Sequence, residues 1–140
     1  GGYLDSDGTG GGRTYHHTAP TAMVAALHAG LERILAEGLD AVIARHEKAG
    51  RILQEGLQEM GLELFAQEGA RLPDLTTVKV PEGVDAGAVR GELLDRFNIE
   101  IGAGAGKFAK SVWRIGLMGP NASEDSAELV LAALRAVLKR

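Results

Sequence analysis

The sequence predicts a domain that mixes helices and strands, α/β in the broad sense and α+β in the narrow one. It has a small, mostly antiparallel sheet of three to four strands, with helices packed on one face. Apolar residues recur at helical spacing as far as Gly61, and alternating or β-branched segments then intermix with further helices. The chain has 140 residues, 45% of them hydrophobic and 24% charged. This length and composition are typical of one globular domain built around a single apolar core.

Two helices are expected first. Apolar residues recur at helical spacing over residues 23–35, with Thr18 or a neighbour as the N-cap. Gly38 ends or kinks this helix, and a second amphipathic stretch covers residues 39–60. Gly61 follows it at the position where helices commonly end on glycine.

Strands are expected after the second helix. Residues 62–66 alternate apolar and other side chains, and residues 75–80 form a β-branched run closed by Pro81. Residues 112–117 form the last strand, with Trp113 as its natural core residue. The predicted element order is therefore two helices, two strands, a helix, two strands and a helix, the third strand lying near residue 101.

The last two helices each follow a capping residue. Asp85 can cap the third helix, and Asn121 with Glu124 forms a candidate capping box for the fourth. Both helices are expected to be apolar on one side, through Val89, Leu93, Leu94 and Phe97 in the third and Val130, Leu131, Leu134, Val137 and Leu138 in the fourth.

Composition narrows the classes of function. The formal net charge is -4 without a strong basic cluster, which argues against nucleic acid as a partner. No apolar run approaches the length of a membrane span, and no leader sequence opens the chain. We therefore expect a cytoplasmic protein without a membrane partner. Because the chain begins at Gly1 rather than Met, it is also a candidate piece of a longer protein.

Two short motifs do not carry the chemistry that they first indicate. The segment GAGAGK at residues 102–107 resembles a phosphate loop, but Ile101 stands where a Walker loop has its first glycine and Phe108 where it has Ser or Thr. A hinge or lid is the favoured interpretation. His16, His17, His28 and His46 lack the spacing of a metal site, and His46 on its apolar helix face is favoured as a hydrogen-bonded core or interface residue.

Two places are candidates for anion binding. Strand alternation puts Arg114 on the face opposite Trp113, where it is either solvent-exposed or turned toward a ligand or another domain. Its planar guanidinium matches a carboxylate or phosphate. Tyr15 and Thr18 precede a helix start, where the helix dipole favours an anion, although simple capping explains them equally well.

These segments together resemble the C-terminal part of the alanine–glyoxylate and serine–pyruvate aminotransferases, in the class V branch of pyridoxal-phosphate enzymes. The resemblance spans nearly everything from Arg13 onward. It is carried by RTYHHTAP, ALHAGLERILAEGL, LTTVKVPEGVD and NIEIGAGAGKFAKSVWRIGLMGPNA.

The resemblance implies the C-terminal domain of a fold-type I enzyme. Residues 13–140 would be this domain with its leading helix, residues 1–12 a flexible glycine-rich segment, and the large domain with the cofactor lysine would lie outside this chain. The family transfers an amino group from alanine or serine to glyoxylate or pyruvate through pyridoxal 5'-phosphate. It acts as a homodimer whose cofactor site is shared between subunits.

The resemblance also implies roles for the anion-binding candidates. Tyr15 and Thr18 match the pair that reaches the cofactor phosphate of the neighbouring subunit, and Arg114 matches the arginine that binds the α-carboxylate of the amino acid. No catalytic residue is expected in this chain, and the chain alone is expected to be inactive. Its candidate lysines all lie outside the family's cofactor-lysine context: Lys48, Lys79, Lys107, Lys110 and Lys139.

Two alternatives remain. The chain could be a free-standing α/β domain that binds a small molecule or regulates a partner without catalysis. A large exposed apolar patch would favour the aminotransferase part, because a domain separated from its enzyme exposes its interface, whereas a polar surface would favour the free-standing domain. Desulfuration, another class V activity, is disfavoured because the chain has no cysteine.

Overall fold

The computed structural model describes residues 18–139, so the expectations for residues 1–12, Tyr15, His16 and His17 lie outside the described residues. The chain divides into two units at Gly38. The first described unit is helix α1, and the second holds the sheet and the other helices. Within residues 18–139, no helix combines the length and hydropathy needed to span a bilayer.

Helix α1 spans Thr21–Glu37 and ends where the sequence predicts, at Gly38. Gly38 has a φ of 90°, and its N–H donates to the Ile34 carbonyl at 2.8 Å. The N-cap position is occupied by Pro20 and not by Thr18, and the Pro20 side chain makes no capping hydrogen bond. Proline suits a helix start because its fixed φ and missing N–H cost nothing there.

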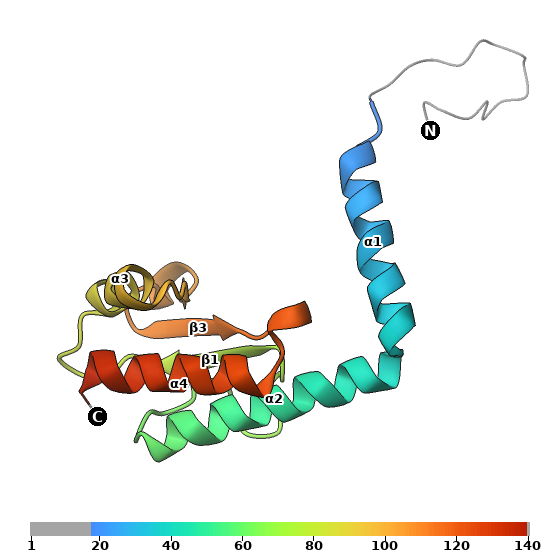
Figure 1. Cartoon of the computed structure of the whole chain (residues 1–140). Helices are drawn as coiled ribbons and strands as arrows, with labels where there is room; N and C mark the ends of the chain where they lie inside the picture. The colour runs from blue at the N-terminus through green and yellow to red at the C-terminus, as the bar shows by residue number, and fades with distance from the viewer. Residues whose placement is uncertain (1–17, 140) are drawn as a thin grey trace, which may run out of the picture. The chain divides into compact units, whose positions relative to one another are not determined.

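The second unit confirms the predicted fold class. Three antiparallel strands lie in the order β1, β3, β2, and the helices pack on one face of this sheet (Figure 1). The elements are α2 (Leu39–Glu59), β1 (Leu75–Lys79), α3 (Ala86–Phe97), β2 (Gly102–Ala103), β3 (Val112–Gly116) and α4 (Glu124–Leu138), with short 3-10 helices η1 (Gly106–Phe108) and η2 (Gly119–Asn121) on either side of β3.

The core lies between the sheet and the helices. Trp113 is fully buried, and its indole N–H donates to the Ala86 carbonyl at 3.1 Å, as a buried indole requires. Leu53 and Leu57 of α2 and Leu134 of α4 are also fully buried, and α2 and α4 pack side by side. Each such leucine contributes about 1.5–3 kcal/mol relative to an exposed side chain.

The strand expected over residues 62–66 is reduced to a bridge. Leu64 pairs with Val78 of β1, and the Phe65 N–H donates to the Thr77 carbonyl at 2.8 Å. The chain then turns away, with Gly69 at a φ of 83°. The sequence therefore predicted extended backbone here, but too few residues stay beside β1 to form a strand.

Two expectations for the last helices are wrong in detail. Ser123, not Asn121, is the N-cap of α4, and its hydroxyl accepts from the Ser126 N–H at 3.1 Å. Asn121 is instead the last residue of η2, which delays the start of the helix. In α3, Leu94 is 46% exposed, because the apolar stripe follows Val89 and Leu93 at four-residue spacing and leaves Leu94 at its edge.

Candidate functional site

Arg114 lies at the centre of the sheet, on the face that the helices leave open. Its neighbours along β3, Trp113 and Ile115, are buried on the opposite face, as the alternation predicts. Its direct cross-strand partners are Thr77 of β1 and Gly102 of β2. The central strand thus carries a cationic side chain with a short neighbour on each side.

One hydrogen bond fixes the Arg114 side chain. Its Nε–H donates to the Ala103 carbonyl at 2.7 Å. The side chain runs past Gly102, where a Cβ atom would stand 3.5 Å from Arg114 Nε. Because Nε is bound to a backbone carbonyl, the N–H groups of both terminal nitrogens stay available for an anion.

The acceptor that orients Arg114 is neutral. Within residues 18–139, no carboxylate lies within ion-pair distance of its guanidinium. Arg96, by contrast, pairs with Glu92 one helical turn away on α3. An exposed guanidinium without a carboxylate partner can take a planar anion through two parallel charge-assisted hydrogen bonds.

Thr18 is the described member of the expected phosphate-binding pair. It is exposed and lies just before the start of α1, in the first unit of the chain, whereas Tyr15 lies outside the described residues. Pro20, at the N-cap, has no side-chain group that could accept from the first-turn N–H groups of α1. The cofactor role of Tyr15 and Thr18 stays a prediction.

Three of the described lysines make contacts on the surface of the second unit. Lys48 pairs with Glu124 at 2.7 Å, and Lys79 pairs with Glu63. Lys107 lies over the Phe108 ring, 5.2 Å from its centroid. A lysine that attacks a carbonyl carbon must be neutral, which desolvation favours and a carboxylate partner opposes. That no residue of this chain acts as the cofactor lysine stays a prediction.

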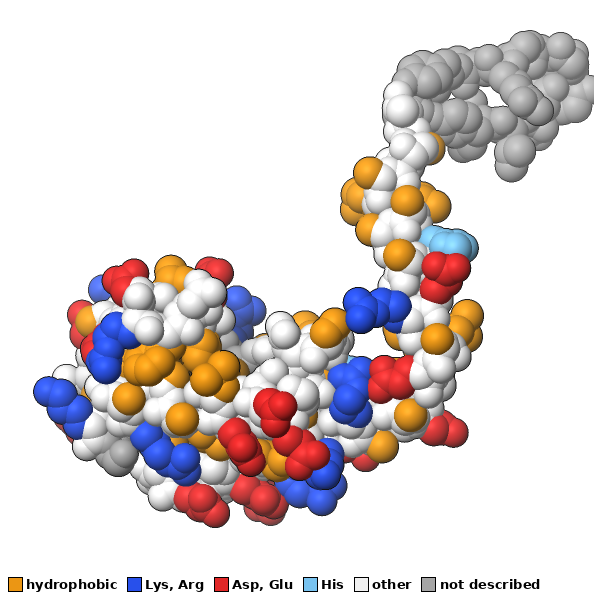
Figure 2. All heavy atoms as spheres, viewed as in Figure 1, with side chains coloured by type: hydrophobic (Ala, Val, Ile, Leu, Met, Phe, Trp, Pro, Cys, Tyr) orange, Lys and Arg blue, Asp and Glu red, His pale blue; other side chains and the backbone are white. Residues whose placement is uncertain are grey.

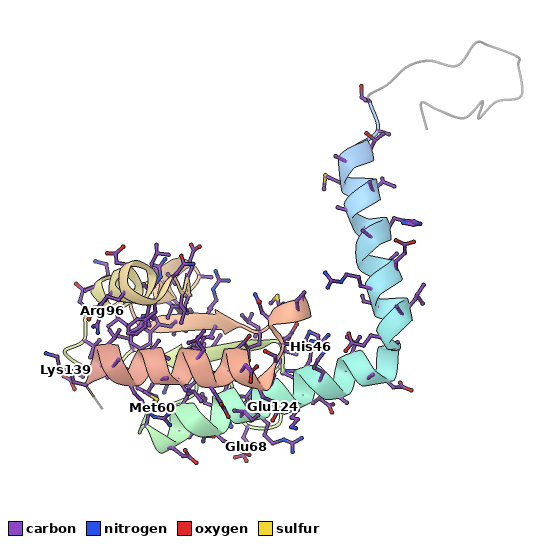
Figure 3. The ribbon with its side chains drawn as sticks, viewed as in Figure 1. His46, Met60, Glu68, Arg96, Glu124 and Lys139 are labelled. Atoms are coloured by element: carbon purple, nitrogen blue, oxygen red, sulfur yellow. The ribbon has the colours of Figure 1, made fainter. Side chains whose placement is uncertain are left out.

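His46 is a hydrogen-bonded structural residue, as the sequence predicts. The Gly119 N–H donates to His46 Nε2 at 3.2 Å, so Nδ1 carries the proton and donates to the Val42 carbonyl at 2.7 Å. Figure 3 shows His46 on α2, beside the segment that leads into α4. Arg45 strengthens this junction through the Gly119 and Ala122 carbonyls.

Sequence reasoning missed the groups that hold Arg114. A backbone carbonyl, here that of Ala103, leaves no mark in the residue pattern. Gly102 is part of a glycine-rich run that indicates a hinge, yet it pairs with Arg114 in the sheet. One signal could have identified Gly102: a long arginine side chain on an open sheet face needs a small residue beside it on the neighbouring strand.

Several known proteins resemble this chain in sequence and in fold. No family model matches the chain. The (S)-ureidoglycine–glyoxylate transaminase of Bacillus subtilis is 41% identical over 128 residues, which are 91% of this chain and 31% of that protein. The alanine–glyoxylate aminotransferase of Drosophila melanogaster is 39% identical over 128 residues, 91% of this chain and 32% of that protein.

A solved structure gives the same result in three dimensions. The alanine–glyoxylate aminotransferase of Nostoc sp. matches with a TM-score of 0.82 and 46% identity, over 90% of this chain and 33% of that chain. The chain thus spans about a third of the length of the proteins it matches. It belongs to the aminotransferases of the alanine–glyoxylate type, of which it represents a fragment.

Proposed function

We propose that residues 13–140 are the C-terminal, substrate-binding domain of a pyridoxal-phosphate aminotransferase that moves an amino group from alanine or serine to glyoxylate or pyruvate in the cytoplasm. The observation that carries this proposal is Arg114, which is exposed on the open sheet face and, among residues 18–139, is bound through Nε alone. The names of the Bacillus and Drosophila relatives, both of which act on glyoxylate, support the acceptor.

In this proposal Arg114 binds the α-carboxylate of the amino acid. The two terminal nitrogens donate in parallel to the two carboxylate oxygens, while the Ala103 carbonyl keeps the guanidinium plane in one orientation. Fixing the carboxylate fixes the direction of the Cα–H bond, and small displacements there cost large factors in rate. The cofactor, when bound, supplies the electron sink for removal of the Cα proton.

Tyr15 and Thr18 complete the proposed site from another subunit. Their hydroxyl groups bind the cofactor phosphate across the interface of a homodimer, near the start of α1, where the helix dipole favours an anion. Replacing Tyr15 by Phe and Thr18 by Ala should loosen the cofactor, which equilibrium dialysis of the complete enzyme measures. Unchanged cofactor retention would remove both residues from the site.

The surface of α1 favours the interpretation that the chain is part of an aminotransferase over the interpretation that it is a free-standing binding domain. Its large apolar side chains are between 38% and 81% exposed, and Figure 2 shows such side chains along the helix. An apolar helix of this kind is typical of a surface that is covered in the complete protein. The residues are Met23, Val24, Leu27, Leu31, Ile34 and Leu35.

The proposal is tested with the complete protein. The absorbance spectrum with pyridoxal phosphate is recorded before and after addition of alanine. A cofactor band that changes with alanine supports transamination, and its absence favours the free-standing binding domain. Under the proposal this chain by itself shows no such change, because its described lysines are placed for ion pairing and surface contact.

The role of Arg114 is tested by Arg114→Lys in the same protein. Lysine keeps the charge but loses the paired donors and the Nε–H that binds Ala103. We expect alanine to bind about ten- to a hundredfold more weakly, the range for losing a hydrogen bond to a charged group. Unchanged affinity in the half-reaction would remove Arg114 from the site.

A further inference from the structure

The carbonyl that orients Arg114 is part of a tightly closed turn. Ala103 is the last residue of β2, and the next residue, Gly104, donates its N–H to the Val112 carbonyl at 2.8 Å. This bond continues the pairing of β2 with β3 by one residue. The position of the Ala103 carbonyl therefore depends on Gly104 staying beside β3.

Gly104 has no room for a side chain. A Cβ atom built on it would stand 2.3 Å from the Phe108 carbonyl oxygen and 2.8 Å from the Phe108 carbonyl carbon. Both atoms belong to the backbone, so a side chain at this position forces the turn apart. Gly106 differs, because a Cβ there meets nothing within 4 Å.

Phe108 is held from the other side of the turn. Its N–H donates to the Ala105 carbonyl at 3.1 Å, and its ring packs edge-on against Phe65, with the centroids 5.0 Å apart. Phe65 is itself bound beside β1 through the Thr77 carbonyl. The backbone of Phe108 therefore cannot move away from Gly104 without breaking contacts to both neighbours.

We infer that Gly104 is a positioning residue for Arg114: its close contact with the Phe108 backbone holds the Ala103 carbonyl where it accepts from Arg114 Nε. The inference rests on the proposed role of Arg114 as the carboxylate-binding group. A guanidinium held in one orientation loses less side-chain entropy when the substrate binds. Gly104 thus acts on substrate affinity through Arg114 and touches neither substrate nor cofactor.

The test is a double-mutant cycle in the complete protein, with alanine as the varied substrate. Gly104→Ala should raise the KM for alanine about two- to tenfold, the cost of immobilising one side chain on binding that the free enzyme no longer holds in place, with a smaller change in kcat. In the Arg114→Lys background, which lacks the Nε–H donor, the same substitution should leave KM unchanged. A purely structural role would lower activity equally in both backgrounds.

Two further variants keep the result interpretable. Gly91→Ala, in α3 where a Cβ meets nothing within 4 Å, is the matched control and should leave KM as in the wild type. Phe65→Leu removes the edge contact with Phe108 at a ring that is 42% exposed. It should also raise KM, and it provides the test if Gly104→Ala does not fold.

The outcomes separate this inference from the proposed function. If the wild-type enzyme turns over alanine but Gly104→Ala and Phe65→Leu keep its KM, the inference is overturned and the role of Arg114 stands. An increase in KM that persists in the Arg114→Lys background overturns it as well. If the complete wild-type protein never turns over alanine, the proposed function fails, and this inference fails with it.

Discussion

At the scale of single residues, helices α3 and α4 each begin at a side chain that caps the first turn. Asp85 accepts from the N–H groups of Gly87 and Ala88 at 2.8 and 2.9 Å, and these bonds hold the pKa of its carboxyl below the ordinary value of 3.8. A carboxyl with a lowered pKa in the folded state stabilises the fold above the unfolded-state pKa. That contribution is lost as the pH falls through the folded-state pKa.

The pH dependence of Asp85 is testable by urea unfolding. Asp85→Asn keeps an acceptor at the cap but cannot be protonated in this range. The loss of stability between neutral pH and a pH below 3.8 should therefore be smaller in Asp85→Asn than in the wild type. Equal losses in the two proteins would show that the cap does not titrate with folding.

The cap of α4 gives a second prediction at this scale. Ser123→Ala removes the acceptor for the Ser126 N–H and should lower the free energy of unfolding by about 0.5–2 kcal/mol. Ser123→Asp, which retains an acceptor oxygen, is the matched control and should stay near the wild type. Equal stability of the alanine variant and the wild type would contradict the assigned cap.

At the scale of elements, glycines decide how closely α2 approaches its neighbours. A Cβ at Gly50 would stand 2.3 Å from the Pro73 carbonyl oxygen, so the helix passes against the backbone that leads into β1. A Cβ at Gly56 would stand 2.3 Å from a methyl carbon of Leu131 on α4. The first contact is with rigid backbone, and the second is with the end of a flexible side chain.

This difference predicts an order of stabilities. Gly50→Ala should destabilise the fold by about 1–3 kcal/mol, because the Pro73 backbone must shift. Gly56→Ala should cost less, since Leu131 can change rotamer. Gly91→Ala, with open space in α3, should stabilise by about 0.5–1 kcal/mol through helix propensity. Urea unfolding of the three variants measures the order, and a tolerated Gly50→Ala would contradict the close contact.

At the scale of the whole molecule, the two units differ in how they bury apolar side chains. The second unit encloses a core around Trp113, whereas α1 has no buried residue. A helix that buries nothing gains little from tertiary packing, which supplies most of the stability of helices in proteins. Its apolar stripe therefore needs a covering surface to stay helical.

We expect the 140-residue chain by itself to associate through α1. Sedimentation velocity should show species larger than the monomer, and Leu27→Ser with Leu31→Ser should shift the distribution toward monomer. The matched control is Leu129→Ser, an equally exposed apolar residue on α4. A wild-type chain that stays monomeric at all concentrations would contradict this expectation.

Local patterns in the sequence were sufficient for most of the second unit. The period of apolar residues identified α2, β1, α3, β3 and α4, because each buries one face against a common core. Alternation alone put Arg114 opposite Trp113, as the structure has it. The sequence also predicted the Asp85 cap, because an acidic side chain just before a helix accepts from the first free N–H groups.

Only the tertiary structure decided which backbone groups surround Arg114. Residues far apart along the chain, Thr77, Ala103 and Arg114, meet because β3 pairs with strands on both sides. Tertiary packing also explains two differences from the prediction: residues 62–66 form only a bridge, and the cap of α4 is Ser123. The physical reason is that side-chain periodicity reports which face is buried, whereas backbone partners depend on how distant segments pack.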